Sequence, residues 1–142
     1  MLDSFDRAAR FAPLVLRLFL AVFLVYKTQD NVFSSARMQE FEGFLAANGF
    51  PAPAVCARLS VYAQFACGIL IALGALTRWA ALAMIGNFVV AILGVHVGLP
   101  FDTYLEPSAM LACSIALLLT GAGPFSVDGW LAARVTSRES GS

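Results

Sequence analysis

Residues 54–76 read AVCARLSVYAQFACGILIALGAL and residues 79–99 read WAALAMIGNFVVAILGVHVGL, with a short turn between them. A helix needs about 20 mostly apolar residues to cross the hydrocarbon core of a bilayer, and each stretch reaches that length. Prolines bound the pair, because Pro53 precedes the first stretch and Pro100 follows the second. The two stretches therefore predict two membrane-spanning helices joined by a tight turn.

Two further apolar stretches lie at residues 12–29 and 103–120. Pro13 suits the first turn of a helix, and the glycine-rich residues 121–124 end the last stretch. The first stretch is long and lacks a small-residue cleavage site, so we expect a retained span rather than a cleaved signal peptide. The sequence thus predicts an all-α, integral membrane four-helix bundle in which residues 1–142 form one domain.

The composition agrees with a membrane protein. Apolar residues make up 60% of the chain and charged residues 13%, against roughly 45–50% and roughly 25% in soluble domains. A soluble fold of 142 residues leaves too much surface exposed to hide this apolar area, so membrane lipid is the expected partner. The net charge is zero, which excludes nucleic acid as a partner because such binding needs a basic face.

Basic residues set the expected orientation, because cytoplasmic loops are enriched in Lys and Arg. With four spans, the amino end, the turn at 77–78 and the carboxyl tail share one side. The basic residues on that side are Arg7, Arg10, Arg78, Arg134 and Arg138. The opposite side, formed by the connections 30–53 and 100–102, holds only Arg37. Both termini are therefore predicted to lie in the cytoplasm.

The connection 30–53 is the only long one, and its apolar residues recur at helical spacing. They are Met38, Phe41, Phe44 and Leu45. Charged residues fall between them and Gly49 follows as a stop, so we predict a short amphipathic helix lying at the outer membrane interface. A specific docking site for a partner is the alternative. The polar tail after Asp128 is expected to be frayed.

One ionisable residue from each span lies near the predicted outer boundary of the membrane. These residues are Lys27, Arg58, His96 and Glu106. Each lies about three to five residues inside that boundary, or roughly 5–7 Å at helical rise, so a bundle would gather them in one layer. If they face inward, they form a polar pocket. Alternatively, the two cations extend to the lipid headgroups and carry no function. Arg17 lies within similar reach of the inner boundary.

Glu106 needs a partner, because a carboxylate cannot extend far toward the headgroups, and either Arg58 or Lys27 would serve. Histidine exchanges protons near neutral pH, so His96 and Glu106 are the candidate catalytic residues, acting by proton exchange. A lone histidine without a second ligand predicts no metal site. The candidate substrate-binding residues are Arg58, Lys27, Tyr104, Gln64 and Arg17.

Gln64 and Asn87 lie near mid-membrane, where hydrogen bonding between helices is the expected role of such residues. Asn87 and His96 are nine residues apart, about half a turn out of phase in an α-helix, so they are not expected to face one pocket squarely. Close helix packing is the expected reason for the glycines of the second and third spans, Gly68, Gly74, Gly86 and Gly94.

Several segments, taken in order, resemble the DoxX family over about residues 14–131. They are LRL at 16–18, GFPAP at 49–53, GILIALGALTR at 68–78, the late His96 of the third span, YLE at 104–106 and GAGPFSVD at 121–128. The resemblance implies a four-helix bundle in a bacterial inner (plasma) membrane. It also implies similarity to the small subunit of thiosulfate:quinone oxidoreductase, and a link to thiol and sulfur redox work.

The chain departs from the family pattern at two places in the polar layer. Family members often carry a glutamate where this chain has Gln64, and a His-Gly pair where it has Lys27 and Thr28. Both changes alter the charge of the layer. A proton-linked quinone reaction through those two family groups is therefore in doubt here, whereas Arg17, His96 and Glu106 remain in place.

Three functions compete at this stage. The first is a membrane subunit of a redox-linked system, based on a quinone or on thiol or sulfur compounds, with its site in the polar layer. No ligand for a redox cofactor is visible in the sequence, so a bound quinone or a partner redox protein would carry the electrons. The second is a non-catalytic membrane anchor or assembly partner, including a homo-oligomer. A small-molecule carrier ranks last because four spans are few and no inverted repeat is visible. Whether the chain is itself an enzyme stays open.

Overall fold

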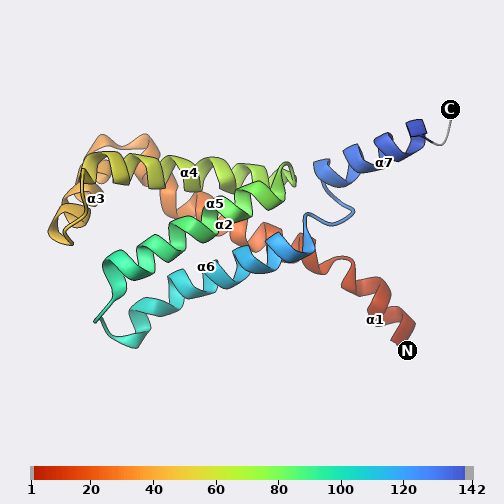
Figure 1. Cartoon of the computed structure of the whole chain (residues 1–142), viewed down its shortest axis with the longest axis horizontal. Coiled ribbons are helices and arrows are strands. Elements are labelled where there is room, and N and C mark those ends of the chain that lie inside the picture. Colours follow the sequence, from red (N-terminus) through yellow and green to blue (C-terminus); the bar gives the residue numbers. More distant parts are fainter. Residues whose placement is uncertain (1, 140–142) are drawn as a thin grey trace.

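The structure in Figure 1 is a computed structural model that describes residues 2–139. Within that range it is helical, with no strand. In chain order the elements are α1 (Leu2–Ala9), α2 (Ala12–Phe33), α3 (Ser35–Ala47), α4 (Pro53–Leu73), α5 (Thr77–Ala91), a π-helical turn (Ile92–His96), α6 (Phe101–Thr120) and α7 (Val127–Glu139). The all-α fold predicted from the sequence is confirmed.

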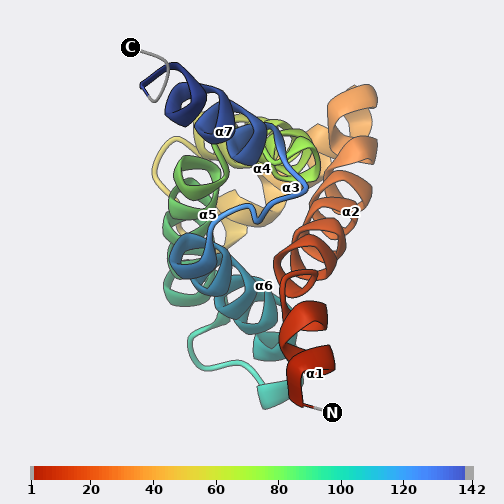
Figure 2. The same cartoon turned by 90° about the vertical axis from the view of Figure 1, so that its right-hand side faces the viewer.

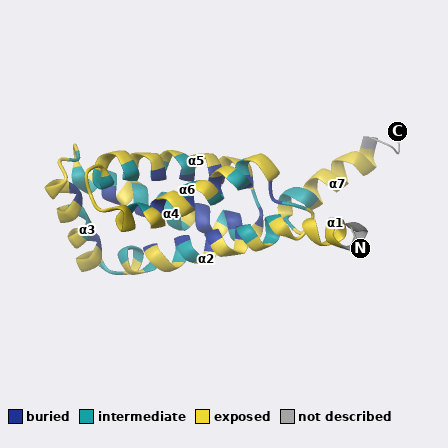
Figure 3. Cartoon of the chain, turned by 90° about the horizontal axis from the view of Figure 1, so that it is seen from below, coloured by how far each residue is buried: buried dark blue, intermediate teal, exposed yellow. Residues whose placement is uncertain are grey.

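The four predicted spans correspond to α2, α4, α5 with its π-helical turn, and α6. Each is long and apolar enough to cross a membrane, yet at most 28% of the residues in any of their apolar windows are buried. Figure 3 shows exposed residues along the outward faces of these helices and buried residues where the helices meet. Since these outward faces are apolar, lipid must cover them, and the protein is a multi-pass membrane protein.

The bundle has two distinct ends. We call the end with α3 and the connection 97–100 the outer end, after the predicted orientation, and the end with the turn 74–76 the inner end. Along the bundle α4 packs chiefly against α2, and α5 packs chiefly against α6. Figure 1 shows α4 and α5 meeting at the inner end and separating toward the outer end.

The predicted amphipathic helix of the long connection is present as α3. Ser34 caps it by accepting a hydrogen bond from the N–H of Arg37, as small hydroxyl residues do at helix starts. Its buried residues Met38 and Leu45 form one hydrophobic cluster with Ala57 and Val61 of α4. The apolar face of α3 is therefore used to pack on the bundle itself.

The prediction of a frayed tail after Asp128 is wrong, because residues 127–139 form α7. The backbone N–H of Asp128 donates to the carbonyl of Gly74 at 2.9 Å. In return its carboxylate accepts hydrogen bonds from the N–H groups of Leu76 and Thr77, at 2.8 and 2.9 Å. Asp128 thus caps α5 and fixes the start of α7, which projects from the same end of the bundle as α1 (Figure 2).

Arg17 joins three segments at the inner end. Its side chain is only 3% exposed, so it does not extend to the headgroups. The guanidinium donates to the carbonyls of Ala122 at 2.7 Å and Phe125 at 2.9 Å, and to that of Ala72 at 3.3 Å. Ala72 lies near the end of α4, whereas Ala122 and Phe125 lie in the connection that follows α6. We call this set of contacts, which joins α2 to α4 and to that connection, the Arg17 clasp.

Gly74 makes the clasp possible. Its φ of +70° lies in the left-handed region, where a side chain is strained. A Cβ at this position would overlap Ser126 Cβ and would lie 2.7 Å from Arg17 Nη1. Glycine is therefore required here both for the backbone turn and for the close approach of Arg17.

Replacing Arg17 by alanine tests the clasp. Arg17→Ala leaves buried carbonyls without a donor, and we expect the free energy of unfolding to fall by at least about 3 kcal/mol. Thermal unfolding of the purified protein in detergent measures this. Arg10→Ala is the matched control, because Arg10 is exposed and only approaches the Phe11 ring, at 5.4 Å. Equal effects of the two substitutions would contradict the clasp.

Candidate functional site

A cavity of about 740 Å³ lies at the outer end, bounded by α3, α4, α5 and α6. Most of its wall is apolar. The polar side chains that line it are Cys56, Ser60, Gln64, Asn87, His96, Asp102, Thr103 and Glu106. A largely apolar pocket of this size with a few converging polar groups is typical of small-molecule sites.

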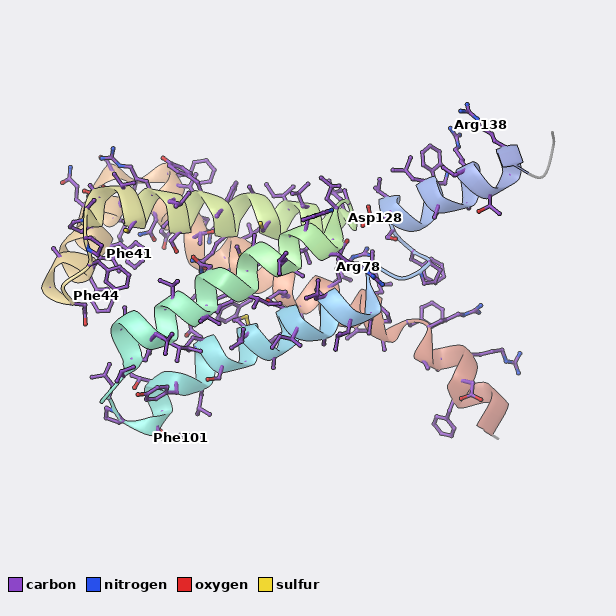
Figure 4. The ribbon with its side chains drawn as sticks, in the orientation of Figure 1. Phe41, Phe44, Arg78, Phe101, Asp128 and Arg138 are labelled. Atoms are coloured by element: carbon purple, nitrogen blue, oxygen red, sulfur yellow. The ribbon has the colours of Figure 1, made fainter. Side chains whose placement is uncertain are left out.

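Aromatic rings line the part of the cavity next to α3. Phe41 and Phe44 of α3 both line it, with their rings stacked at a centroid distance of 6.3 Å (Figure 4). Phe50 lines it from the connection, and its ring packs directly on Gly94, where a Cβ would overlap it. The connection between α3 and α4 therefore forms part of the site as well as a link between spans.

His96 and Asn87 both line the cavity, although in an unbroken α-helix they would not face one pocket squarely. The segment that leads to His96 is not an unbroken α-helix. Residues 92–96 form a π-helical turn, whose hydrogen bonds span five residues instead of four. Each residue then rotates less about the axis, and over this segment the phase lags by roughly a quarter turn. That lag brings His96 toward the face of Asn87.

The neighbours of His96 indicate which ring nitrogen carries the hydrogen in the neutral imidazole. Its Nδ1 lies 2.9 Å from the carbonyl oxygen of Ala91. A carbonyl can only accept, so Nδ1 carries the hydrogen, and the other ring nitrogen of the neutral imidazole is left with its lone pair. Tyr104 does not line the cavity, but its ring lies 6.0 Å from that of His96 and its hydroxyl accepts from the N–H of Gly98 at 3.1 Å. Tyr104 thus supports the loop beside His96.

Glu106 has the partner that the sequence required, and it is Lys27. The Lys27 ammonium lies 3.1 Å from one carboxylate oxygen and 3.2 Å from the other. Both side chains are about half exposed, at 45% and 52%, so the pair is accessible. Glu106 lines the cavity while Lys27 does not. The ammonium therefore reaches the site only through Glu106.

Arg58 is paired away from the cavity. Its Nε donates to Oε1 of Glu42 on α3 at 3.1 Å, and Arg58 does not line the cavity. The two predicted cations of the polar layer are thus each held by a carboxylate. The four ionisable residues of the predicted layer lie at one end of the bundle. Of these four, His96 and Glu106 line the cavity, whereas Lys27 and Arg58 do not.

Gln64 lies in a short polar chain at the middle of the spans. Its amide donates to the hydroxyl of Ser60 at 3.0 Å, and Ser60 donates to the side-chain oxygen of Asn87 at 2.7 Å. This chain links α4 to α5, as expected for polar residues at that depth. Ser60 was missed from the sequence. The four-residue spacing of Cys56, Ser60 and Gln64 on an apolar span was the signal that could have revealed it.

Arg17 lies outside this site. It is buried in the clasp at the inner end, at the opposite end of the bundle from His96, and it does not line the cavity. Its guanidinium donates to backbone carbonyls, and these hydrogen bonds account for its burial without any bound ligand.

These features define a class of protein: an α-helical multi-pass membrane protein with a ligand-sized cavity between its spans. Residues 12–97 match the family DoxX. The match covers more than half of the chain, so the protein belongs to the DoxX family, whose members are commonly linked to redox or quinone-related systems. The match ends before α6. No curated protein and no solved structure matches the chain.

Cysteine reactivity tests whether the cavity is open to water at the outer end. Cys56 lines the cavity and its thiol contacts the carbonyl of Pro51, whereas Cys67 is buried in the core at 8% exposure. In single-cysteine variants of the purified protein, we expect a charged, water-soluble maleimide to modify Cys56 at least about tenfold faster than Cys67, because the reagent needs access to the thiolate. Equal rates, followed by mass spectrometry, would show a closed cavity.

Proposed function

We propose that this protein is the membrane-embedded subunit of a redox-linked system, and that its outer cavity binds the head of a quinone. The observation that carries the proposal is the meeting of His96 and Glu106 in one mostly apolar cavity inside the bundle. Apolar walls suit a ring compound that dissolves in the membrane. Two proton-exchanging groups suit a ligand whose chemistry involves protons.

The residues present fit such a ligand. The lone pair left on His96 can accept a hydrogen bond or a proton, and the imidazolium can donate one. Thr103 lines the same part of the cavity, and its hydroxyl, which donates to the carbonyl of Pro100, can still accept a hydrogen bond. Reduction of a bound quinone to its quinol would take up two electrons and two protons. His96 and Glu106 would exchange the protons, and a partner redox protein would exchange the electrons.

Charge favours a neutral ring compound over a sulfur oxyanion. The carboxylates that line the cavity are Asp102 and Glu106, and His96 is the basic side chain in the lining. The nearby cations Lys27 and Arg58 lie outside the lining and are each paired with a carboxylate. An anion would therefore meet two carboxylates in a site of low polarity, which is costly.

Assembly with a partner is a second candidate function, and α7 favours it. This helix projects beyond the bundle at the inner end (Figure 2) and leaves Trp130, Leu131 and Val135 exposed, at 53%, 49% and 59%. Such a face fits a partner protein or the membrane surface. A partner that co-purifies in mild detergent and is lost when α7 is removed would support assembly.

Quinone binding tests the proposed site directly. We expect His96→Phe and Glu106→Gln each to weaken binding of a short-tailed benzoquinone about tenfold, because the first removes a polar group of the cavity and the second replaces its carboxylate by a neutral amide. Titration calorimetry on protein in lipid nanodiscs measures this. Glu40→Gln is the matched control, since Glu40 is an exposed α3 residue paired with Arg37 and does not line the cavity. No saturable binding to the unmodified protein would refute the function.

We also propose a bacterial inner membrane with both termini in the cytoplasm. Lys27 and Arg58, the cations near the outer end, are each offset by a carboxylate, so the basic surplus lies with the inner-end residues. A fluorescent protein that matures only in the cytoplasm, fused after the last residue, should fluoresce. A phosphatase that is active only outside the cytoplasm should be inactive at the same position. The reverse pattern would show an inverted protein.

A further inference from the structure

The outer cavity continues inward as a groove between α4 and α5. On α5 its lining includes Ala83, Gly86 and Val90, and on α4 it includes Leu59 and Ala63. These positions repeat every three or four residues, so each set occupies one face of its helix. From Ala83 to Val90 the groove follows α5 for about 10 Å at helical rise. The two helices separate along this length, as Figure 1 shows.

The rim of the groove faces the lipid. Leu59 and Val90 line the cavity and yet are 69% and 55% exposed. Their neighbours Tyr62 and Leu93 are exposed on the same helices, at 52% and 67%. Exposed surface at this depth of a spanning helix meets hydrocarbon chains. The groove is therefore open sideways to the bilayer.

Gly86 is not explained by helix packing, although the sequence predicted that role for it. Gly68 does show close packing, because a Cβ there would lie 3.0 Å from Val25 and 3.1 Å from Leu24. At Gly86 no atom lies within 4 Å of the position that a Cβ would take, so the missing side chain leaves space in the groove. Ala83, one turn away, adds a second small side chain to the same floor.

The polar groups are distributed unevenly along this space. His96, Asp102 and Glu106 line its outer part. Further in, the polar side chains are Ser60, Gln64 and Asn87, which hydrogen-bond to one another. At the same depth Ala63 and Gly86 line the apolar side of the groove, and Ala83 continues that apolar lining one turn further in. A ligand that matches this pattern has a polar head and a linear apolar tail.

We propose that the groove between α4 and α5 holds the hydrocarbon tail of a membrane-dissolved quinone, which enters sideways from the lipid and places its head in the outer cavity. This inference rests on the proposed function and adds the substrate class, a long-tailed quinone. A cavity of about 740 Å³ is larger than a bare ring needs, and the tail accounts for the remaining apolar space.

Filling the groove at Gly86 tests the tail site. A Cβ at Gly86 meets no atom within 4 Å, and leucine favours helix more than glycine does, so Gly86→Leu is expected to fold. We expect it to weaken binding of a long-tailed isoprenoid quinone about tenfold, as loss of two methylene contacts would, and to change binding of the short-tailed benzoquinone less than about twofold. Affinities are compared as the ratio of variant to unmodified protein in nanodiscs, which cancels partitioning of the quinone into lipid.

Gly43→Leu is the matched control. Gly43 is an exposed residue of α3, has no atom within 4 Å of its Cβ position and does not line the cavity, so neither affinity should change. Unchanged binding of the long-tailed quinone to Gly86→Leu would overturn the tail site, as would equal weakening for both quinones. If Gly86→Leu fails to fold, Ala83→Leu is subject to the same two outcomes. Failure of both quinones to bind the unmodified protein would instead refute the proposed function.

Discussion

The Arg17 clasp is the constraint on which the rest of the structure depends. One guanidinium binds a carbonyl near the end of α4 and two carbonyls of the connection after α6, and so ties α2 to α4 and to the segment that ends α6. Asp128 adds α5 by capping its first N–H groups. All four spans are thereby fixed together at the inner end. Because this end is fixed by polar contacts, α4 and α5 are free to separate toward the outer end, where the cavity lies (Figure 1).

The spans could be predicted from sequence because lipid leaves so few alternatives. A backbone in hydrocarbon must satisfy its own hydrogen bonds, so length and hydropathy alone identify the four helices. The inner end could not be predicted in the same way. Asp128 bonds to N–H groups 51 and 52 residues away, and Arg17 bonds to Ala122, 105 residues away. No local pattern specifies such partners, so the sequence placed Arg17 only within reach of the inner boundary and among the candidate substrate-binding residues.

The sequence predicted how deep in the membrane the candidate site residues lie, but not which way their side chains face. Counting residues from the span ends placed His96 and Glu106 in one layer, and both line the cavity. Which way each residue faces depends on helical phase, and the π-helical turn at 92–96 changes that phase. Partner choice was equally hidden, because Glu42 lies on α3 and draws Arg58 away from the pocket. The sequence could place four ionisable residues in one layer, but it could not decide whether Lys27 or Arg58 pairs with Glu106.

The polar groups of the cavity bear on how a ligand would be held. Ser60, Gln64 and Asn87 hydrogen-bond to one another, the Nδ1 of His96 bonds to Ala91, and Glu106 is paired with Lys27. These polar groups are satisfied within the protein, so a ligand would have to compete with the protein's own hydrogen bonds for its polar contacts. The rim of the cavity also faces lipid, at Leu59 and Val90. For the quinone proposed above, both features favour exchange with a membrane pool over permanent retention.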